Sequence, residues 1–176
     1  MIFKILILLL IITLGCYIFN KLINIDQEAL EMRLSALTNK FYGIQEDLPN
    51  SQKAVEMIGK LELFIDKLIN YLDTKYSKSE DIRVDRLIKR LHNIKLEESP
   101  DELNTSSYTL NKGELIALWV RYKDTKDIHD YELLKFVVIH ELAHVASVST
   151  GHNAEFLKNF KWLLNEATEA GIYEPV

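Results

Sequence analysis

The segment FVVIHELAHVASVSTGHNAEF, from Phe136 to Phe156, decides how the rest of the chain is interpreted. His140 and His144 are four residues apart, and Glu141 directly follows the first histidine. On an α-helix, positions i and i+4 lie about 40° apart and one turn along, so both imidazoles can reach one ion. Glu141 lies about 100° around the helix from His140, where it would contact a water on that ion rather than the ion itself. The spacing therefore predicts a metal site with a carboxylate beside a bound water.

The residues around this HExxH pattern favour a buried metal site over a chance match. HExxH is short, and histidines on helices are often ordinary core or surface residues. From Leu133 to Ala146, however, the other residues are apolar on every face of the helix, Lys135 excepted. Buried histidine and glutamate side chains need polar partners, because an unpaired buried polar group is costly. A metal ion with an activated water supplies those partners together, and zinc is the metal that HExxH helices bind.

A catalytic zinc commonly has three protein ligands and keeps a fourth position for water. His152 is expected to be the third ligand, because Gly151 can turn the chain out of the first helix and a second helix is predicted over residues 153–169. Two alternatives stay open. His129 precedes the HExxH helix, and Glu155 follows it, as in those HExxH enzymes that use a downstream glutamate. The preference of zinc for imidazole favours His152 over Glu155.

The segment resembles the active-site segment of the WLM and SprT-like zinc metallopeptidases. In those families a third histidine follows the HExxH helix after a short loop, and a phenylalanine comes four residues later, as His152 and Phe156 do here. The resemblance covers roughly residues 107–174 and is similar in particular to WLM-like proteins carried by large DNA viruses, which share the Gly171-Ile-Tyr ending. Metzincins differ, because they would place a histidine at Thr150.

This resemblance implies a zincin-like fold and zinc-dependent hydrolysis of peptide bonds in a polypeptide substrate. It implies Zn²⁺ as the cofactor, His140, His144 and His152 as its ligands, and Glu141 as the general base. Tyr173 is implied as a donor to the oxyanion, by its place in the shared ending.

Two other functional classes are consistent with the residues. The first is a catalytically inactive, zinc-bearing module that binds proteins at a membrane. The second is a structural membrane protein whose long helix recruits partners, with a coincidental HExxH. Retention of all four site residues argues against the first class, and a metal measurement would separate the second.

Composition limits the class of protein, its partners and its disulfide bonds. The chain has 176 residues, of which 48% are hydrophobic and 27% charged, as expected for a globular protein. Its net charge of −5 argues against a nucleic-acid partner, which usually requires a basic surface. Cys16 is the only cysteine, so the chain forms no internal disulfide.

The amino-terminal stretch is expected to anchor the chain in a membrane. Residues 5–19 are almost wholly apolar, near the lower length limit for crossing a bilayer. A cleaved signal peptide is the main alternative, but no small-x-small cleavage site follows the apolar core. The positive charges after the stretch lean toward a cytoplasmic catalytic domain. We therefore expect a transmembrane anchor over 1–21, a helical stalk or linker over 22–49, and a zincin-like metallopeptidase domain over 50–176.

The remaining segments predict an α+β fold, mostly helical, with a small antiparallel hairpin before the HExxH helix. Helices are expected over 26–41, from residue 50 or 51 through Leu72, and over 79–92; residues 95–104 are expected to form a loop. Two β-prone runs, 107–110 and 115–120, flank the turn Asn111-Lys-Gly. The second run is expected to border the cleft and to offer its edge to an extended peptide.

Overall fold

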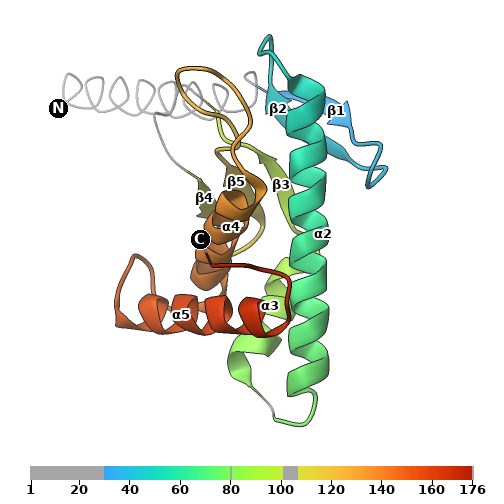
Figure 1. Cartoon of the computed structure of the whole chain (residues 1–176). Helices are drawn as coiled ribbons and strands as arrows, with labels where there is room; N and C mark the ends of the chain where they lie inside the picture. The colour runs from blue at the N-terminus through green and yellow to red at the C-terminus, as the bar shows by residue number, and fades with distance from the viewer. Residues whose placement is uncertain (1–29, 80, 101–106, 176) are drawn as a thin grey trace, which may run out of the picture.

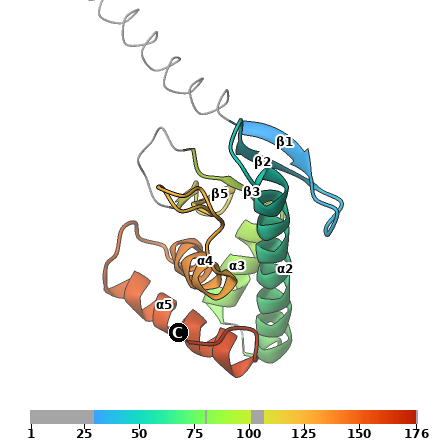
Figure 2. The ribbon, with the colours of Figure 1, turned by 45° about the horizontal axis from the view of Figure 1, so that its top comes forward.

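The computed structural model describes residues 30–79, 81–100 and 107–175, and Figures 1 and 2 show a sheet with the helices gathered on one side of it. The elements in chain order are β1 (Leu30–Leu34), β2 (Phe41–Gln45), α2 (Ser51–Tyr76), α3 (Ile82–Leu91), β3 (Lys95–Glu98), β4 (Tyr108–Leu110), β5 (Leu115–Leu118), α4 (Tyr131–Ala146) and α5 (Ala154–Glu169). The α+β class is thus confirmed.

Five strands of the described residues form one mixed sheet in the order β1-β2-β3-β5-β4. The pairs β1–β2 and β4–β5 are antiparallel, and the pairs β2–β3 and β3–β5 are parallel. The hairpin predicted before the HExxH helix is confirmed, with Leu110 opposite Leu115 and positive φ angles at all three turn residues. The expected role of the second strand needs one correction. The strand at 115–120 is internal, because β3 and β4 pair with its two edges, and among the described residues β4 is the edge strand.

The core lies between the sheet and α2, α3 and α4. Ile44, Leu96, Ile116 and Leu118 point from neighbouring strands to one face and are buried. The helix α2 covers that face with the stripe predicted from its spacing: Ala54, Leu61, Phe64, Leu68 and Leu72 are buried, and Met57 is partly buried. Because α2, α3 and α5 all pack against α4, the helix that carries the HExxH pattern is held by three neighbours.

The helix predicted over 26–41 is wrong for the residues that are described. Residues 30–34 form β1 and residues 41–45 form β2, so the expected helical stalk is a β-hairpin of the sheet. The helix-forming residue types favoured a helix locally, but β-pairing overrides such weak preferences. The turn is fixed by Glu56 of α2, whose carboxylate accepts hydrogen bonds from Ser35 Oγ (2.7 Å) and Ala36 N (2.8 Å).

The loop predicted over 95–104 is also wrong in its first part, because residues 95–98 form β3 inside the sheet. The strand was hard to recognise because it buries a charged side chain. Glu98 is fully buried, where its carboxylate accepts hydrogen bonds from Arg121 Nε (2.6 Å) and Gln45 N (2.9 Å). An ion pair supplied by distant residues makes an acidic residue tolerable in a central strand.

The expected anchor, residues 5–19, lies outside the described residues and stays a prediction. Among the described residues, none of the helices has both the length and the apolar composition required to cross a bilayer.

Candidate metal centre and active site

The helix α4 follows Asp130 and carries the first two histidines. The Asp130 carboxylate caps the helix by accepting hydrogen bonds from Glu132 N (2.8 Å) and Leu133 N (3.3 Å). Ten residues later, the rings of His140 and His144 are half-buried on the same side of the helix, with centroids 5.1 Å apart. The prediction of a largely buried helix holds for the second half, whereas Leu133 and Phe136 are exposed.

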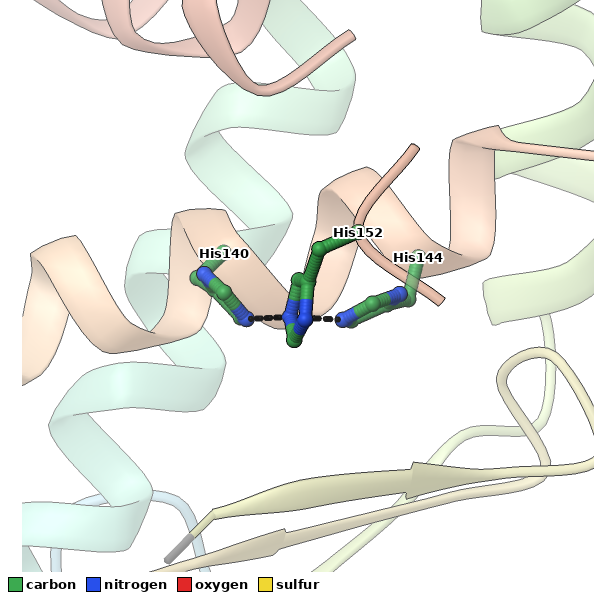
Figure 3. Close-up of side chains that lie close together, drawn as sticks. All are labelled: His140, His144 and His152. Atoms are coloured by element: carbon green, nitrogen blue, oxygen red, sulfur yellow. Dashed lines mark hydrogen bonds between the residues drawn. The ribbon is translucent and has the colours of Figure 1, made fainter. Parts of the chain in front are cut away.

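His152 reaches the same point from the loop between α4 and α5. Gly151 has a φ of 78°, which turns the chain back over α4. The His152 Nε2 atom lies 2.9 Å from His140 Nε2 and 3.2 Å from His144 Nε2, and Figure 3 shows its ring between the other two. One ligand atom from each of the three residues falls within 4.8 Å of the others. The structure therefore brings together all three predicted metal ligands.

The donor set fits a zinc ion. Zinc bonds to three imidazoles at tetrahedral angles would hold the nitrogens about 3.3 Å apart. The Nε2 atom of His152 lies within a few tenths of an ångström of that distance from the Nε2 atoms of both His140 and His144. Neutral imidazole is the form that binds metal, and the site favours it. Burial and the neighbouring His152 lower the pKa of His140, and burial, His140, His152 and Lys112 lower the pKa of His144 to about 4.

Phe156 forms an apolar base beneath the three imidazoles. Its ring is buried, and its centroid lies 4.8 Å from that of His140, 4.3 Å from His144 and 4.7 Å from His152. Asn153 caps α5 by accepting a hydrogen bond from Phe156 N (3.1 Å), so the helix that carries Phe156 starts directly after His152. This packing restricts the rotation of the imidazoles and explains why Phe156 follows His152 by four residues.

Neither alternative ligand belongs to the cluster. Glu155 instead fixes the loop: its carboxylate accepts hydrogen bonds from Val148 N (2.8 Å), Ser149 N (3.0 Å) and Ser149 Oγ. The bond from Ser149 Oγ and then the two backbone bonds lower the pKa of Glu155 to about 2. His129 lies before α4 with its ring 3.9 Å from that of Tyr122, and burial lowers its pKa.

Three cations that the sequence analysis did not single out hold the end of α4. Arg86 donates to the carbonyl of Ala146, Arg90 to those of Val145 and Ser147 (2.9 Å), and Lys112 to that of Ser149. The last carbonyls of a helix have no partner within the helix and attract positive charge. These bonds fix the end of α4 and the first residues of the loop that presents His152.

Glu141 is the most buried of the four predicted site residues, and Thr109 is its partner. Thr109 Oγ1, on the edge strand β4, donates to Glu141 Oε2 at 2.7 Å. Burial raises the pKa of Glu141 to about 6, although the Thr109 bond acts in the opposite direction. The sequence placed Thr109 in a β-prone run but gave no sign that this run faces the helix.

The raised pKa of Glu141 leads to a prediction for the metal-free chain. The folded chain binds this proton more tightly than the unfolded chain, whose carboxyl has an ordinary pKa of 4.5. The stability that the proton contributes is complete below pH 4.5 and is lost as the pH rises through about 6. A difference of 1.5 units corresponds to about 2 kcal/mol.

We therefore expect metal-free Glu141→Gln to unfold with a free energy about 2 kcal/mol greater than metal-free wild type at pH 7.5, and equal to it near pH 4. Glutamine has similar size and still accepts the Thr109 bond, but it has no charge to bury. Urea unfolding in the presence of a chelator at both pH values measures the difference. Equal stabilities at pH 7.5 would show that Glu141 is not strained by burial.

Tyr173 does not lie with the histidines. Its ring is buried about 6.0 Å from Lys135 Nζ, which also hydrogen-bonds to the carbonyl of Ile172 at 2.7 Å. Lys135 precedes His140 by five residues, which places it about 140° around α4 from that histidine. Tyr173 thus closes the far side of the helix, and its position gives no support to the predicted role of oxyanion donor.

Two cavities meet at the site, and both are lined by Ser107, His140 and Glu141. One, of about 610 Å³, extends along the first half of α4 and has mostly apolar walls. The other, of about 560 Å³, extends past His144 and His152, and its lining residues include Lys112 and Thr150. The metal cluster and the Glu141 carboxylate therefore lie between two connected halves of one cleft.

Known proteins share this sequence and this fold. The model of a family described as the WLM domain matches residues 44–174. Uncharacterized protein R325 of Acanthamoeba polyphaga mimivirus is 33% identical over 144 residues, which cover 81% of this chain and 73% of that protein. Uncharacterized protein 136R of Invertebrate iridescent virus 6 is 40% identical over 83 residues, which cover 46% of this chain and 43% of that protein.

Among solved structures, Wss1 from Saccharomyces cerevisiae is similar with a TM-score of 0.50 and 18% identity, over 73% of this chain and 89% of that one. A mutant of Wss1 gives a TM-score of 0.51, also at 18% identity, over 74% of this chain and 92% of that one. These likenesses support the fold, and the predicted resemblance to viral WLM-like proteins is confirmed by sequence. The family match spans both cavities, α4 and all three histidines, and on that ground the chain belongs to the WLM-domain family.

Proposed function

We propose that the chain is a zinc-dependent peptidase in which His140, His144 and His152 hold the ion and Glu141 is the general base. The observation that carries this proposal is the convergence of three imidazole nitrogens in a cleft beside a buried carboxylate. Three imidazoles with an open fourth position are typical of catalytic zinc rather than structural zinc.

In the proposed hydrolysis, the three histidines hold the ion and Glu141 transfers the proton. A zinc ion at this position supplies a Lewis acid that acidifies a water and polarises a carbonyl group. Glu141 accepts the proton of the attacking water, and because Thr109 occupies Oε2, we assign that proton to Oε1. Glu141 then gives the proton to the amine nitrogen of the departing product. Its pKa of about 6 in the metal-free site is close to the value that suits a group which both accepts and donates near neutral pH.

A polypeptide is the substrate class that fits the cleft. β4 is the edge strand of the described sheet and lies beside Glu141, and an extended chain can add to an edge strand through main-chain hydrogen bonds. On the sequence alone, the acidic net charge argues against a nucleic-acid ligand. Residues 5–19 are proposed, also from the sequence alone, to attach this peptidase to a membrane with the catalytic domain on the cytoplasmic side.

Cleavage of an unfolded protein tests the proposal. Purified chain loaded with one equivalent of zinc is expected to fragment a reduced, unfolded protein, to stop when a zinc chelator is added, and to resume when zinc is restored. Gel electrophoresis and mass spectrometry of the fragments measure this. A chain that binds zinc and the unfolded protein without cutting it would instead support the inactive binding module, and a folded chain that takes up no zinc would refute both.

A further inference from the structure

The larger of the two cavities has an apolar wall that the proposed hydrolysis does not require. We name it the apolar cavity: it runs from Glu141 toward the amino end of α4, and Trp119, Leu133, Phe136 and Val137 form its apolar wall. Ser107, Lys123 and His129 also line it. Leu133, Phe136 and Val137 follow a spacing of three and four residues that ends at His140, so they lie on the same side of α4 as the metal ligands. One helix face thus holds both the ligands and the apolar wall.

The exposed apolar side chains on this wall indicate a ligand. Leu133 is 43% exposed and Phe136 is 38% exposed, on a helix whose other half is buried. Contiguous exposed apolar surface in a concave site usually marks the place where a ligand binds. A volume of about 610 Å³ is within the range of small-molecule and side-chain pockets.

The walls of the apolar cavity are supported from outside. The ring of Phe136 packs edge-on against that of Phe160 of α5, with centroids 5.2 Å apart. Lys123 Nζ lies 5.2 Å from the centroid of Trp119, over the indole ring. Val137 packs against the core between these two sides and one turn before His140. Because these contacts fix the walls, the cavity can discriminate between side chains by size.

The position of Glu141 relates the cavity to the scissile bond. The apolar cavity and the second cavity, which extends past His144 and His152, share Ser107, His140 and Glu141. A polypeptide that places the attacked carbonyl beside Glu141 therefore extends into both. One neighbour of the scissile bond meets Leu133, Phe136 and Val137, whereas the chain on the other side meets Lys112 and Thr150.

We propose that the apolar cavity selects the substrate by holding a large apolar or aromatic side chain adjacent to the scissile bond, with Val137 limiting its size. The proposal rests on the proposed peptidase function, since it assumes that the three histidines hold zinc. It assigns to this chain a preference for cutting beside residues such as phenylalanine or leucine. Such residues are buried in folded proteins, so unfolded polypeptides would be the favoured substrates.

The test is a binding experiment with the zinc-loaded full chain and two succinyl hydroxamates, which attach to zinc and carry either a benzyl or a methyl side chain. Wild type is expected to bind the benzyl probe at least about 10-fold more tightly. Val137→Phe, which fills the cavity, should bring the two affinities to within about 2-fold by weakening the benzyl probe alone. Val137→Ala, which cannot overpack the core, should keep the preference for benzyl. Leu157→Phe adds the same ring at an exposed position of α5 and should behave as wild type.

Equal affinities of wild type for the two probes, or an unchanged benzyl preference in a folded Val137→Phe chain, would overturn the proposal. Failure of both probes to bind a zinc-loaded chain would also overturn it, because the cavity would then not open onto the metal. Zinc content, measured in the same samples, separates these results from a failure of the proposed function. Only a folded chain that takes up no zinc would refute the proposed peptidase function.

Discussion

Glu141→Gln should lower peptide hydrolysis by about 10²–10⁴-fold while the chain still binds one zinc ion. Glutamine cannot accept the proton of the attacking water, and this loss appears in kcat. Zinc is retained because the ligand atoms are the nitrogens of His140, His144 and His152, which the substitution leaves in place. Glutamine can also keep the hydrogen bond from Thr109, so the geometry of the cleft is conserved.

Initial rates on a fluorogenic peptide and zinc content by atomic emission measure the two parts of this prediction. Glu169→Gln is the matched control, since it removes one carboxylate on α5 that pairs with Lys75 at 2.7 Å. It should retain wild-type rates. Comparable turnover by Glu141→Gln at equal zinc content would remove Glu141 from the mechanism, whereas a loss of zinc would reveal a structural role instead.

His152→Ala should weaken zinc binding by more than about 100-fold. Groups that merely orient a ligand cost about 10–100-fold when they are removed, so a direct ligand must cost more. Two imidazoles from one helix would remain, without the third that completes the site. Competition for zinc against a chromophoric chelator measures the affinity, and circular dichroism verifies that the variant is folded.

Two further variants give reference values for the loss of zinc affinity in His152→Ala. His92→Ala also removes one histidine, but an exposed one between α3 and β3, and it should bind zinc as tightly as wild type. Glu155→Gln should weaken zinc binding by about 10–100-fold, because it weakens the hydrogen bonds from Val148 and Ser149 that hold the loop of His152. Wild-type affinity in His152→Ala would leave the site with two histidines and return Glu155 and His129 to consideration.

The metal cluster could be predicted because its geometry is mostly local. Two ligands are set by the 3.6-residue period of α4, and the third follows within eight residues through a turn that Gly151 makes possible. Phe156 and the cap at Asn153 belong to the next helix start, which is equally local. Short-range geometry of this kind can be read from residue spacing alone.

The missed features depend on contacts between distant segments. Thr109 meets Glu141 only because the sheet places β4 beside α4, across 32 positions of sequence. The strand β3 was missed because it contains Glu98, whose buried carboxylate pairs with Arg121, 23 positions away. Nothing in the local sequence indicates that partner. Residues 30–34, with the sequence LEMRL, do alternate between apolar and charged side chains, as a strand should. The helix-forming residue types of this segment conceal that alternation.

The strand order places the first strand and the strand beside the cleft at opposite edges of the sheet. β1, which begins at Leu30, forms one edge, and β4, which carries Thr109, forms the other. Four spacings of about 4.8 Å put these edges about 19 Å apart. Leu30 therefore lies at the edge of the sheet remote from Thr109 and the cleft. For this reason, a chain attached ahead of Leu30 to a lipid bilayer, a fused protein or an affinity resin should turn over a long polypeptide as fast as the free chain does.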